Sequence, residues 1–220
     1  ARALVIDPVV LVFSTFLGGD DWDRFGGIAV DKDRCVYVTG QTFSSNFPAK
    51  AAYDSSLDGY ADIFVTKFNA SGKGLVYSTF LGGPVSEGAY GLTVDPAEKV
   101  YFGGYAYDGF PTKNAYDSTY DDSKHGDYFD AIIVKLNALG NLVYSTYLGK
   151  GDDDVVYAIA VDGAGRAYVG GQTDNADFPL KYAFQPHYGD HDDAFVAVFS
   201  AAGNSLETST FIGGNYPDSV

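Results

Sequence analysis

The sequence predicts an all-β fold built from tandem four-stranded sheets, with one extra strand ahead of the first sheet. Three observations lead to this prediction. A motif occurs four times, the segments between its copies are short and rich in Val, Ile, Tyr, Phe and Thr, and Asp, Gly, Asn and Pro occupy the turns between these segments. No segment keeps the 3.6-residue periodicity of a long helix, so helical layers are not expected.

A nine-residue motif recurs at nearly even spacing along the chain. Its copies read LVFSTFLGG from Leu11, LVYSTFLGG from Leu75, LVYSTYLGK from Leu142 and LETSTFIGG from Leu206. Self-similarity at a nearly fixed period indicates tandem structural repeats. The alternating positions of YSTFLGG carry bulky side chains on both sides, so this strand is expected to be covered on both faces of its sheet.

Each unit opens with two short strands joined by a tight turn. The first is apolar and closes on Asp, and the second ends on Gly. The first strands are expected at 27–31, 91–95 and 158–162, and the second at 32–40, 96–104 and 163–171. The closing aspartates are interpreted as acceptors for backbone N–H groups of the turn, because Asp favours such local hydrogen bonds; they are Asp31, Asp95 and Asp162.

A Phe-Pro pair and a variable acidic loop separate the second strand from the third. Each of these loops has room for one helical turn, and each ends on an Asp that opens the third strand. The third strands are expected at 62–68, 130–136 and 193–199, and the nonapeptide supplies the fourth. A Gly-containing turn then leads the chain from the third strand to the next copy of the nonapeptide.

Twisted four-stranded sheets that are covered on both faces are the blades of a β-propeller, which typically has about four to eight of them. The expected boundaries are a lead-in at 1–10, the orphan strand and its loop at 11–26, blades at 27–83, 84–150 and 151–214, and a tail at 215–220. Three blades fall below the usual closed ring. The chain is therefore either a piece of a longer propeller or a unit whose open sheet edges pair with other copies.

The combination YSTFLGG, IAVD, VYVTG-QT and FP, followed by D-A-F-V, resembles the bacterial β-propeller repeat abbreviated SBBP. The resemblance runs from about Leu11 to Gly214, with departures at GYAYDGFP in unit two and at Lys150 in unit three. It implies a propeller fold and a secreted or cell-surface setting. It implies no reaction, because members of this family generally lack an assigned activity.

The chain is strongly acidic, with a formal net charge of −15. This charge disfavours nucleic acid and anionic membrane surfaces as partners, since both would repel it. No apolar run reaches the roughly 18 residues of a spanning helix, so membrane insertion is not expected. The sequence contains no Met, which favours a mature, trimmed or excised segment. Cys35 is the single cysteine and allows no disulfide within the chain.

Two acidic turns are candidate Ca²⁺ sites, because closely spaced carboxylates on a turn can supply several oxygen ligands. The candidates are Asp20, Asp21 and Asp23 after the first nonapeptide, and Asp152, Asp153 and Asp154 after the third. Unit two breaks the pattern with PVSEG, and neither cluster matches an EF-hand loop. The alternative interpretation is a pair of solvated loops that bind no metal. No cofactor is expected apart from this calcium hypothesis.

Other reactive residues favour structural interpretations. His125, His187 and His191 lie in variable loops, and the recurring tyrosines lie at strand centres, where packing between blades accounts for them. No GxSxG, Walker, HExxH or CxxC motif occurs. A nucleophilic role for Cys35 would need a nearby His, and unit one has none.

The preferred hypothesis is a non-enzymatic, extracellular or cell-surface structural or adhesive repeat protein. It would assemble into filaments or tubes through strand edges, with copies of itself or adjoining repeats of a longer chain as partners. The alternative is a propeller fragment of a larger secreted protein that binds Ca²⁺ or a glycan. An enzyme whose site is completed by missing blades is the third hypothesis.

Overall fold

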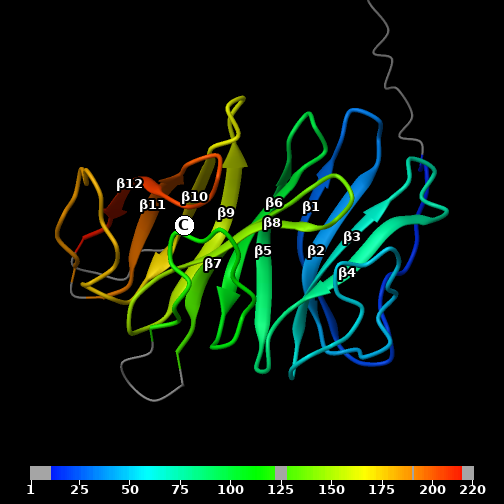
Figure 1. Ribbon diagram of the computed structural model, residues 1–220, viewed down its shortest axis with the longest axis horizontal. Coiled ribbons are helices and arrows are strands. Elements are labelled where there is room, and N and C mark those ends of the chain that lie inside the picture. The colour runs from blue at the N-terminus through cyan, green and yellow to red at the C-terminus, as the bar shows by residue number, and fades with distance from the viewer. Residues whose placement is uncertain (1–10, 122–127, 190, 215–220) are drawn as a thin grey trace, which may run out of the picture.

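The computed structural model describes residues 11–121, 128–189 and 191–214. Within these ranges the chain is all-β, as predicted, and forms three four-stranded antiparallel sheets that lie side by side (Figure 1). The lead-in at 1–10, the tail at 215–220 and His125 lie outside the described residues.

Each sheet is formed by four strands that are consecutive in the chain. The first contains β1 (Asp23–Val30), β2 (Val36–Thr42), β3 (Asp62–Phe68) and β4 (Leu75–Leu81). The second contains β5 (Glu87–Val94), β6 (Val100–Ala106), β7 (Asp130–Leu136) and β8 (Leu142–Leu148). The third contains β9 (Asp154–Val161), β10 (Ala167–Thr173), β11 (Asp193–Phe199) and β12 (Leu206–Ile212). These sheets are the blades that the repeat predicts.

The expected boundary between 26 and 27 falls inside β1. The pairing of β1 with β2 continues back to Asp23, across a β-bulge between Phe25 and Gly27. A bulge lets a strand bend and keep its partner, so the ladder extends beyond the apolar run visible in the sequence. Gly26 at this bulge meets the carbonyl of Ala89 on β5, a close approach that excludes a Cβ.

The hydrophobic core lies between the sheets. One cluster joins the first and second sheets and includes Tyr37, Ile63 and Phe102. Another joins the second and third and includes Tyr101 and Phe195. The strand-centre tyrosines Tyr37, Tyr77, Tyr101 and Tyr144 are fully buried, as expected for packing between blades. Each sheet therefore depends on its neighbour to bury one face.

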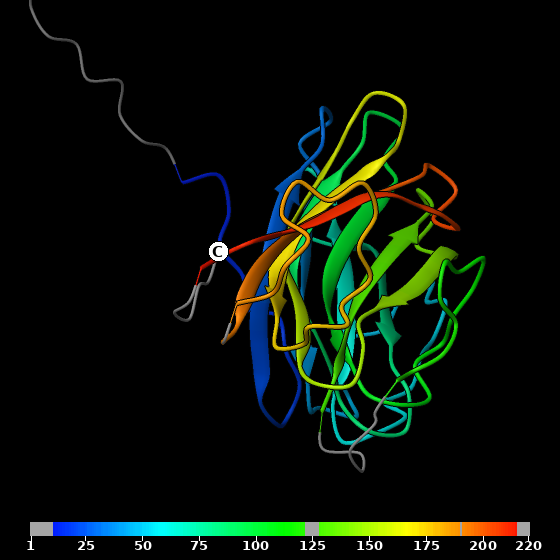
Figure 2. The same cartoon turned by 90° about the vertical axis from the view of Figure 1, so that its left-hand side faces the viewer.

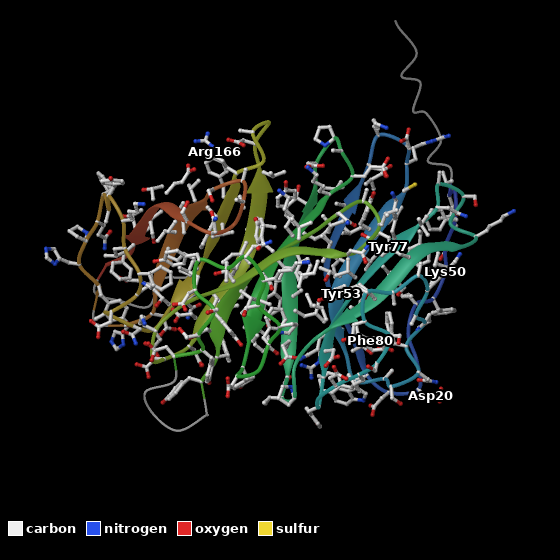
Figure 3. The ribbon with its side chains drawn as sticks, in the orientation of Figure 1. Asp20, Lys50, Tyr53, Tyr77, Phe80 and Arg166 are labelled. Atoms are coloured by element: carbon white, nitrogen blue, oxygen red, sulfur yellow. The ribbon has the colours of Figure 1, made fainter. Side chains whose placement is uncertain are left out.

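The loops after the Phe-Pro pairs cover the outer edges of the sheets. Lys50 exchanges two backbone hydrogen bonds with Ser78 on β4, at 3.0 and 2.8 Å. The same bridge joins Lys113 to Ser145 on β8 and Lys181 to Ser209 on β12. Figure 3 shows Lys50 and Tyr53 near Tyr77 and Phe80. The expected helical turns are absent from the described parts of these loops, because the backbone pairs with the outer strand instead.

Residues 11–19, the first copy of the nonapeptide, join none of the three sheets. Figures 1 and 2 show this segment beside the first sheet, at the blue end of the chain. The Phe13 side chain contacts a turn glycine of the next unit, as the equivalent tyrosines of the second and third copies do. These contacts are Phe13 with Gly72, Tyr77 with Gly140 and Tyr144 with Gly203. The orphan segment thus occupies the place that the outer strand of a preceding blade would take.

Candidate functional site

The aspartates that close the first strand of each unit organise the hairpin turns. Asp31 Oδ1 accepts hydrogen bonds from the backbone N–H groups of Asp33 and Cys35, both at 2.9 Å. Asp31 Oδ2 accepts one from the Tyr37 hydroxyl at 3.0 Å. Asp95 and Asp162 repeat this arrangement. The interpretation of these residues as turn acceptors is confirmed.

Asp23, a candidate calcium ligand, holds the turn ahead of β1. Its Oδ2 accepts a hydrogen bond from Gly19 N at 2.8 Å, and its Oδ1 accepts one from Thr42 Oγ1 at 2.6 Å. Asp154 Oδ2 accepts from Lys150 N at 2.9 Å, also four residues earlier. The two carboxylates therefore have the same local role at the start of β1 and β9.

Glu87 has this role in unit two, where the segment PVSEG lacks the cluster of aspartates found in the other units. Its Oε2 accepts a hydrogen bond from Gly83 N at 3.0 Å. The feature that recurs is one acidic residue four positions after the last residue of the LGG or LGK segment, and this residue is Asp in two units and Glu in one. The four-residue spacing is present in the sequence, but the neighbouring aspartates of units one and three make it hard to recognise.

The remaining calcium candidates are tied to nearby backbone. Asp21 Oδ1 accepts from Trp22 N at 2.8 Å, and Asp153 Oδ1 accepts from Phe129 N at 3.1 Å. Asp20 donates its N–H to Asn46 Oδ1 at 2.9 Å and lies at the lower rim of the first sheet in Figure 3. The N–H of Asp152 bonds the Lys150 carbonyl at 2.8 Å. Over the described ranges, no group of three or more His, Cys, Asp or Glu residues is placed to hold a metal ion. The calcium hypothesis stays a prediction.

A groove of about 560 Å³ between the first and second sheets is the strongest binding candidate. It brings together aromatic, amide, hydroxyl and charged side chains from both sheets. Its lining is Asp21, Trp22, Arg24, Gln41, Phe43, Gly59, Tyr60, Ser86 and Tyr105. Trp22 is 68% exposed and Tyr60 is 76% exposed, so two large ring surfaces face solvent.

Interactions within the groove fix its aromatic side chains. The Arg24 guanidinium lies 5.6 Å from the Trp22 ring centre and 5.3 Å from that of Phe43. Phe43 and Tyr60 meet edge to face at 5.3 Å. Contacts of this kind are worth about 0.5–1.5 kcal/mol each, enough to hold the rings in place.

The floor of the groove joins the two sheets through Gln41. Its Nε2 donates to the carbonyl of Glu87 at 3.0 Å, to the Tyr105 hydroxyl at 3.1 Å and to Ser86 Oγ at 3.2 Å. The groove is therefore a preformed feature of the stacked sheets. Its side chains suit the recognition of a polar ligand that has flat apolar faces.

Sequence reasoning missed this groove because its residues come from five separate segments. The available signal was a departure from the repeat. The single Trp of the chain, Trp22, stands where the other units have Ser86 and Asp153. The exposed indole therefore belongs to the first junction specifically.

The other candidate reactive residues stay outside the groove. Cys35 is a free thiol that packs against the core, and burial raises its pKa. His187 and His191 lie in the loop that precedes β11. Among the described residues, no helix is long and apolar enough to cross a membrane.

Residues 143–179 match the family model described as Beta-propeller repeat, SBBP. The matched stretch runs from β8 through β9 and β10 to the third Phe-Pro pair. It therefore crosses from one sheet into the next, so the sequence repeat and the blade are offset by one strand. This offset explains why the first copy of the nonapeptide has no sheet of its own. No curated protein gives a match to this chain.

Proposed function

We propose that this chain is a non-enzymatic structural or adhesive repeat protein, extracellular or at the cell surface, that assembles by stacking blades of successive copies. The proposal rests on one observation: apolar residues on β1 of the first sheet are largely exposed, whereas the equivalent residues of the other two sheets are partly buried against the core. The resemblance to propeller repeats and the strongly acidic composition favour the extracellular setting. The route differs from the strand-edge pairing that the sequence suggested, because loops already cover the outer edges.

The leading face of the first sheet carries Phe25, Ile28 and Val30, all largely exposed. Ile28 is 58% exposed, whereas the equivalent residues Leu92 and Ile159 are partly buried against the core of the preceding sheet. Burial of apolar area is worth about 25 cal/mol per Å², so covering this face is stabilising. Within the chain, a sheet of the same repeat packs against the equivalent face of each following sheet.

The trailing face of the third sheet offers the complementary surface. Ile212 on β12 is 52% exposed, whereas its equivalents Leu81 and Leu148 are fully buried at the two internal junctions. Once the orphan segment 11–19 moves aside from the first sheet, the third sheet of one copy can meet the first sheet of the next as sheets meet within one chain. Such a head-to-tail contact does not close between two copies and propagates into a filament unless the rotation closes a ring.

Ile28→Asp is expected to prevent this association, because the stacked interface would bury an unpaired charge. Sedimentation velocity and negative-stain microscopy of the unmodified chain should show concentration-dependent assemblies, and the variant should stay monomeric at the same concentrations. Leu139→Asp, at an exposed turn of the second sheet, is the matched control and should assemble normally. A wild-type chain that stays monomeric at high concentration would contradict the proposal.

The groove at the first junction favours glycan binding as a second candidate function. Exposed aromatic rings can stack on sugar faces, while the neighbouring polar groups bond hydroxyls. Trp22→Ala is expected to weaken binding up to about tenfold, the equivalent of about 1.4 kcal/mol. A glycan array followed by calorimetry on the best hit would measure this loss. Tyr182→Ala, an exposed aromatic outside the groove, is the control. An array without hits would remove this candidate.

A further inference from the structure

Two buried carboxyl groups converge at the junction of the first and second sheets. Asp62 opens β3 and Glu87 opens β5, and both side chains are fully buried. Both approach Gly82: a Cβ at this position would overlap the Asp62 carboxyl and lie 2.7 Å from Glu87 Oε2. The two acids are therefore direct neighbours across a glycine that leaves room for them.

Each of these carboxyls has one oxygen satisfied and one unsatisfied. Asp62 Oδ2 accepts a hydrogen bond from Asp58 N at 3.1 Å, and Glu87 Oε2 accepts one from Gly83 N at 3.0 Å. Asp62 Oδ1 and Glu87 Oε1 are buried without a hydrogen-bond partner. A buried oxygen without a partner costs about 1–3 kcal/mol, more when it is charged, so the pair needs a neutralising species.

The charged groups around the pair make its ionisation harder. Asp58 acts on both carboxyls and Asp54 acts on Asp62, and each is itself acidic. Burial is the largest cause, and it raises the pKa of Asp62 to about 6 and that of Glu87 to about 8. Two adjacent carboxylates in such a site cannot both ionise near neutral pH.

The same arrangement recurs at the junction of the second and third sheets. Asp130 and Asp154 are buried there, and a Cβ on Gly149 would lie 2.8 Å from Asp130 Oδ1 and overlap the Asp154 carboxyl. Asp117, Asp121, Asp153 and Lys150 are the charged groups that act on this second pair. Lys150 is a cation that has no counterpart at the first pair. The recurrence shows that the repeat itself builds these acid pairs.

We propose that Asp62 and Glu87 retain one proton between them and act as a pH-sensitive clamp between the first and second sheets. At acidic and neutral pH at least one of the two buried carboxyls stays protonated, so the pair carries at most one negative charge and the sheets stay closely stacked. At alkaline pH both groups ionise, and their repulsion loosens the junction. A proton fits better than Ca²⁺, which takes about six to eight oxygen ligands, because no group of three or more His, Cys, Asp or Glu residues in the described part of the chain is placed to hold a metal ion.

The pH dependence of stability follows from the direction of the shifts. The pKa of Glu87 rises from 4.5 to about 8 on folding, so the folded chain binds more protons than the unfolded chain between these values. Stability is therefore greatest below about pH 4.5 with respect to this group and is lost as pH rises through 8. Asp62 acts in the same direction, between 3.8 and about 6.

Glutamate labelling gives a direct test, because the sequence contains only Glu87, Glu98 and Glu207 and only the first of these is buried. We expect the ¹³C carboxyl signal of Glu87 in the intact chain to titrate near pH 8. The signals of Glu98 and Glu207 provide internal references, and Glu87→Gln identifies the resonance. Titration of all three signals below pH 5.5 would overturn the proposal. This readout needs only the wild-type fold if the variant does not fold.

Urea unfolding between pH 5 and 9 tests the clamp itself. The unfolding constant of the wild type should rise with pH, by up to about tenfold per pH unit for each extra proton bound. Glu87→Gln should lower this slope by up to one proton, while Asp177→Asn, an exposed carboxylate, should keep it. An unchanged slope in Glu87→Gln would refute the clamp. Removal of the wild-type slope by CaCl₂ would assign the pair to a metal ion instead.

Discussion

Phe102→Ala is expected to destabilise the protein by about 3–5 kcal/mol, the usual cost of removing a buried Phe side chain. Phe102 lies on β6, is fully buried, and belongs to the cluster that joins the first and second sheets. The loss combines the transfer of the ring to water with the cavity it leaves, because closely packed sheets cannot collapse freely around a void.

Urea denaturation followed by far-UV circular dichroism measures this change. Phe184→Ala is the matched control, since Phe184 is 93% exposed and should change the free energy of unfolding by less than about 0.5 kcal/mol. The two substitutions remove the same atoms, so their difference isolates burial.

The same substitution should also show where the stability of the chain resides. Among the described strands, extensive contacts join the second sheet to the first and to the third but do not join the first to the third, so stability approximates a sum of sheet and junction terms. Hydrogen exchange in Phe102→Ala should accelerate more in β1 to β4 than in β9 to β12, because the first of the three described sheets packs only on the second sheet and the substitution weakens that junction. Equal acceleration in all three sheets would show that the chain unfolds as one unit and would contradict the tandem-stack account.

The sequence allowed the strands and their order to be predicted, because local patterns determine both. Each strand is a short run of strand-forming residues closed by a turn residue, and the repeat displays that pattern several times. The role of Asp31 was predictable for the same reason, since its partners lie two and four residues away. Local hydrogen bonds can be inferred from spacing alone.

The contacts between sheets were not predictable in the same way. Asp62 and Glu87 meet only because the second sheet stacks on the first, and no local pattern sets that distance. The groove around Trp22 has the same origin. The loop bridge from Lys50 to Ser78 also escaped prediction, although a Lys and a Ser stand at these positions in all three units, because no local pattern brings the loop to the outer strand. Backbone geometry and position recur from unit to unit in the structure. The identities of the residues reveal this recurrence only in part.

Gly140→Ala is the second substitution expected to have a large effect, at about 2–5 kcal/mol of destabilisation. Gly140 lies in the turn between β7 and β8 with φ of 81°, a left-handed conformation that costs an Ala about 1–2 kcal/mol. A Cβ there would also lie 2.8 Å from the Tyr77 ring on β4, which is fully buried and cannot move aside. Such overpacking adds about 1–3 kcal/mol.

Gly163→Ala is the control, because Gly163 has no heavy atom within 4 Å of the added Cβ and no positive φ. It should leave stability unchanged or raise it by up to about 1 kcal/mol through the entropy of the unfolded chain. Thermal and urea unfolding of both variants measure the difference. Equal effects would show that neither the left-handed φ of Gly140 nor its contact with Tyr77 contributes to stability.

Gly72→Ala completes the comparison, because it presents the same turn to a different partner. Gly72 has φ of 67° and contacts Phe13, which belongs to the orphan segment 11–19 rather than to a sheet. The energetic cost of the left-handed φ should remain, whereas the Phe13 side chain can move away from the added methyl group. The loss of unfolding free energy should therefore be about 1–2 kcal/mol and smaller than at Gly140. In an assembled array a neighbouring blade would place its β12 against this turn, and Thr208 there has no ring to overlap an added methyl. Gly72→Ala should therefore weaken the hold on segment 11–19 without blocking assembly, whereas a loss of assembly would mean that the orphan segment itself forms the contact between copies.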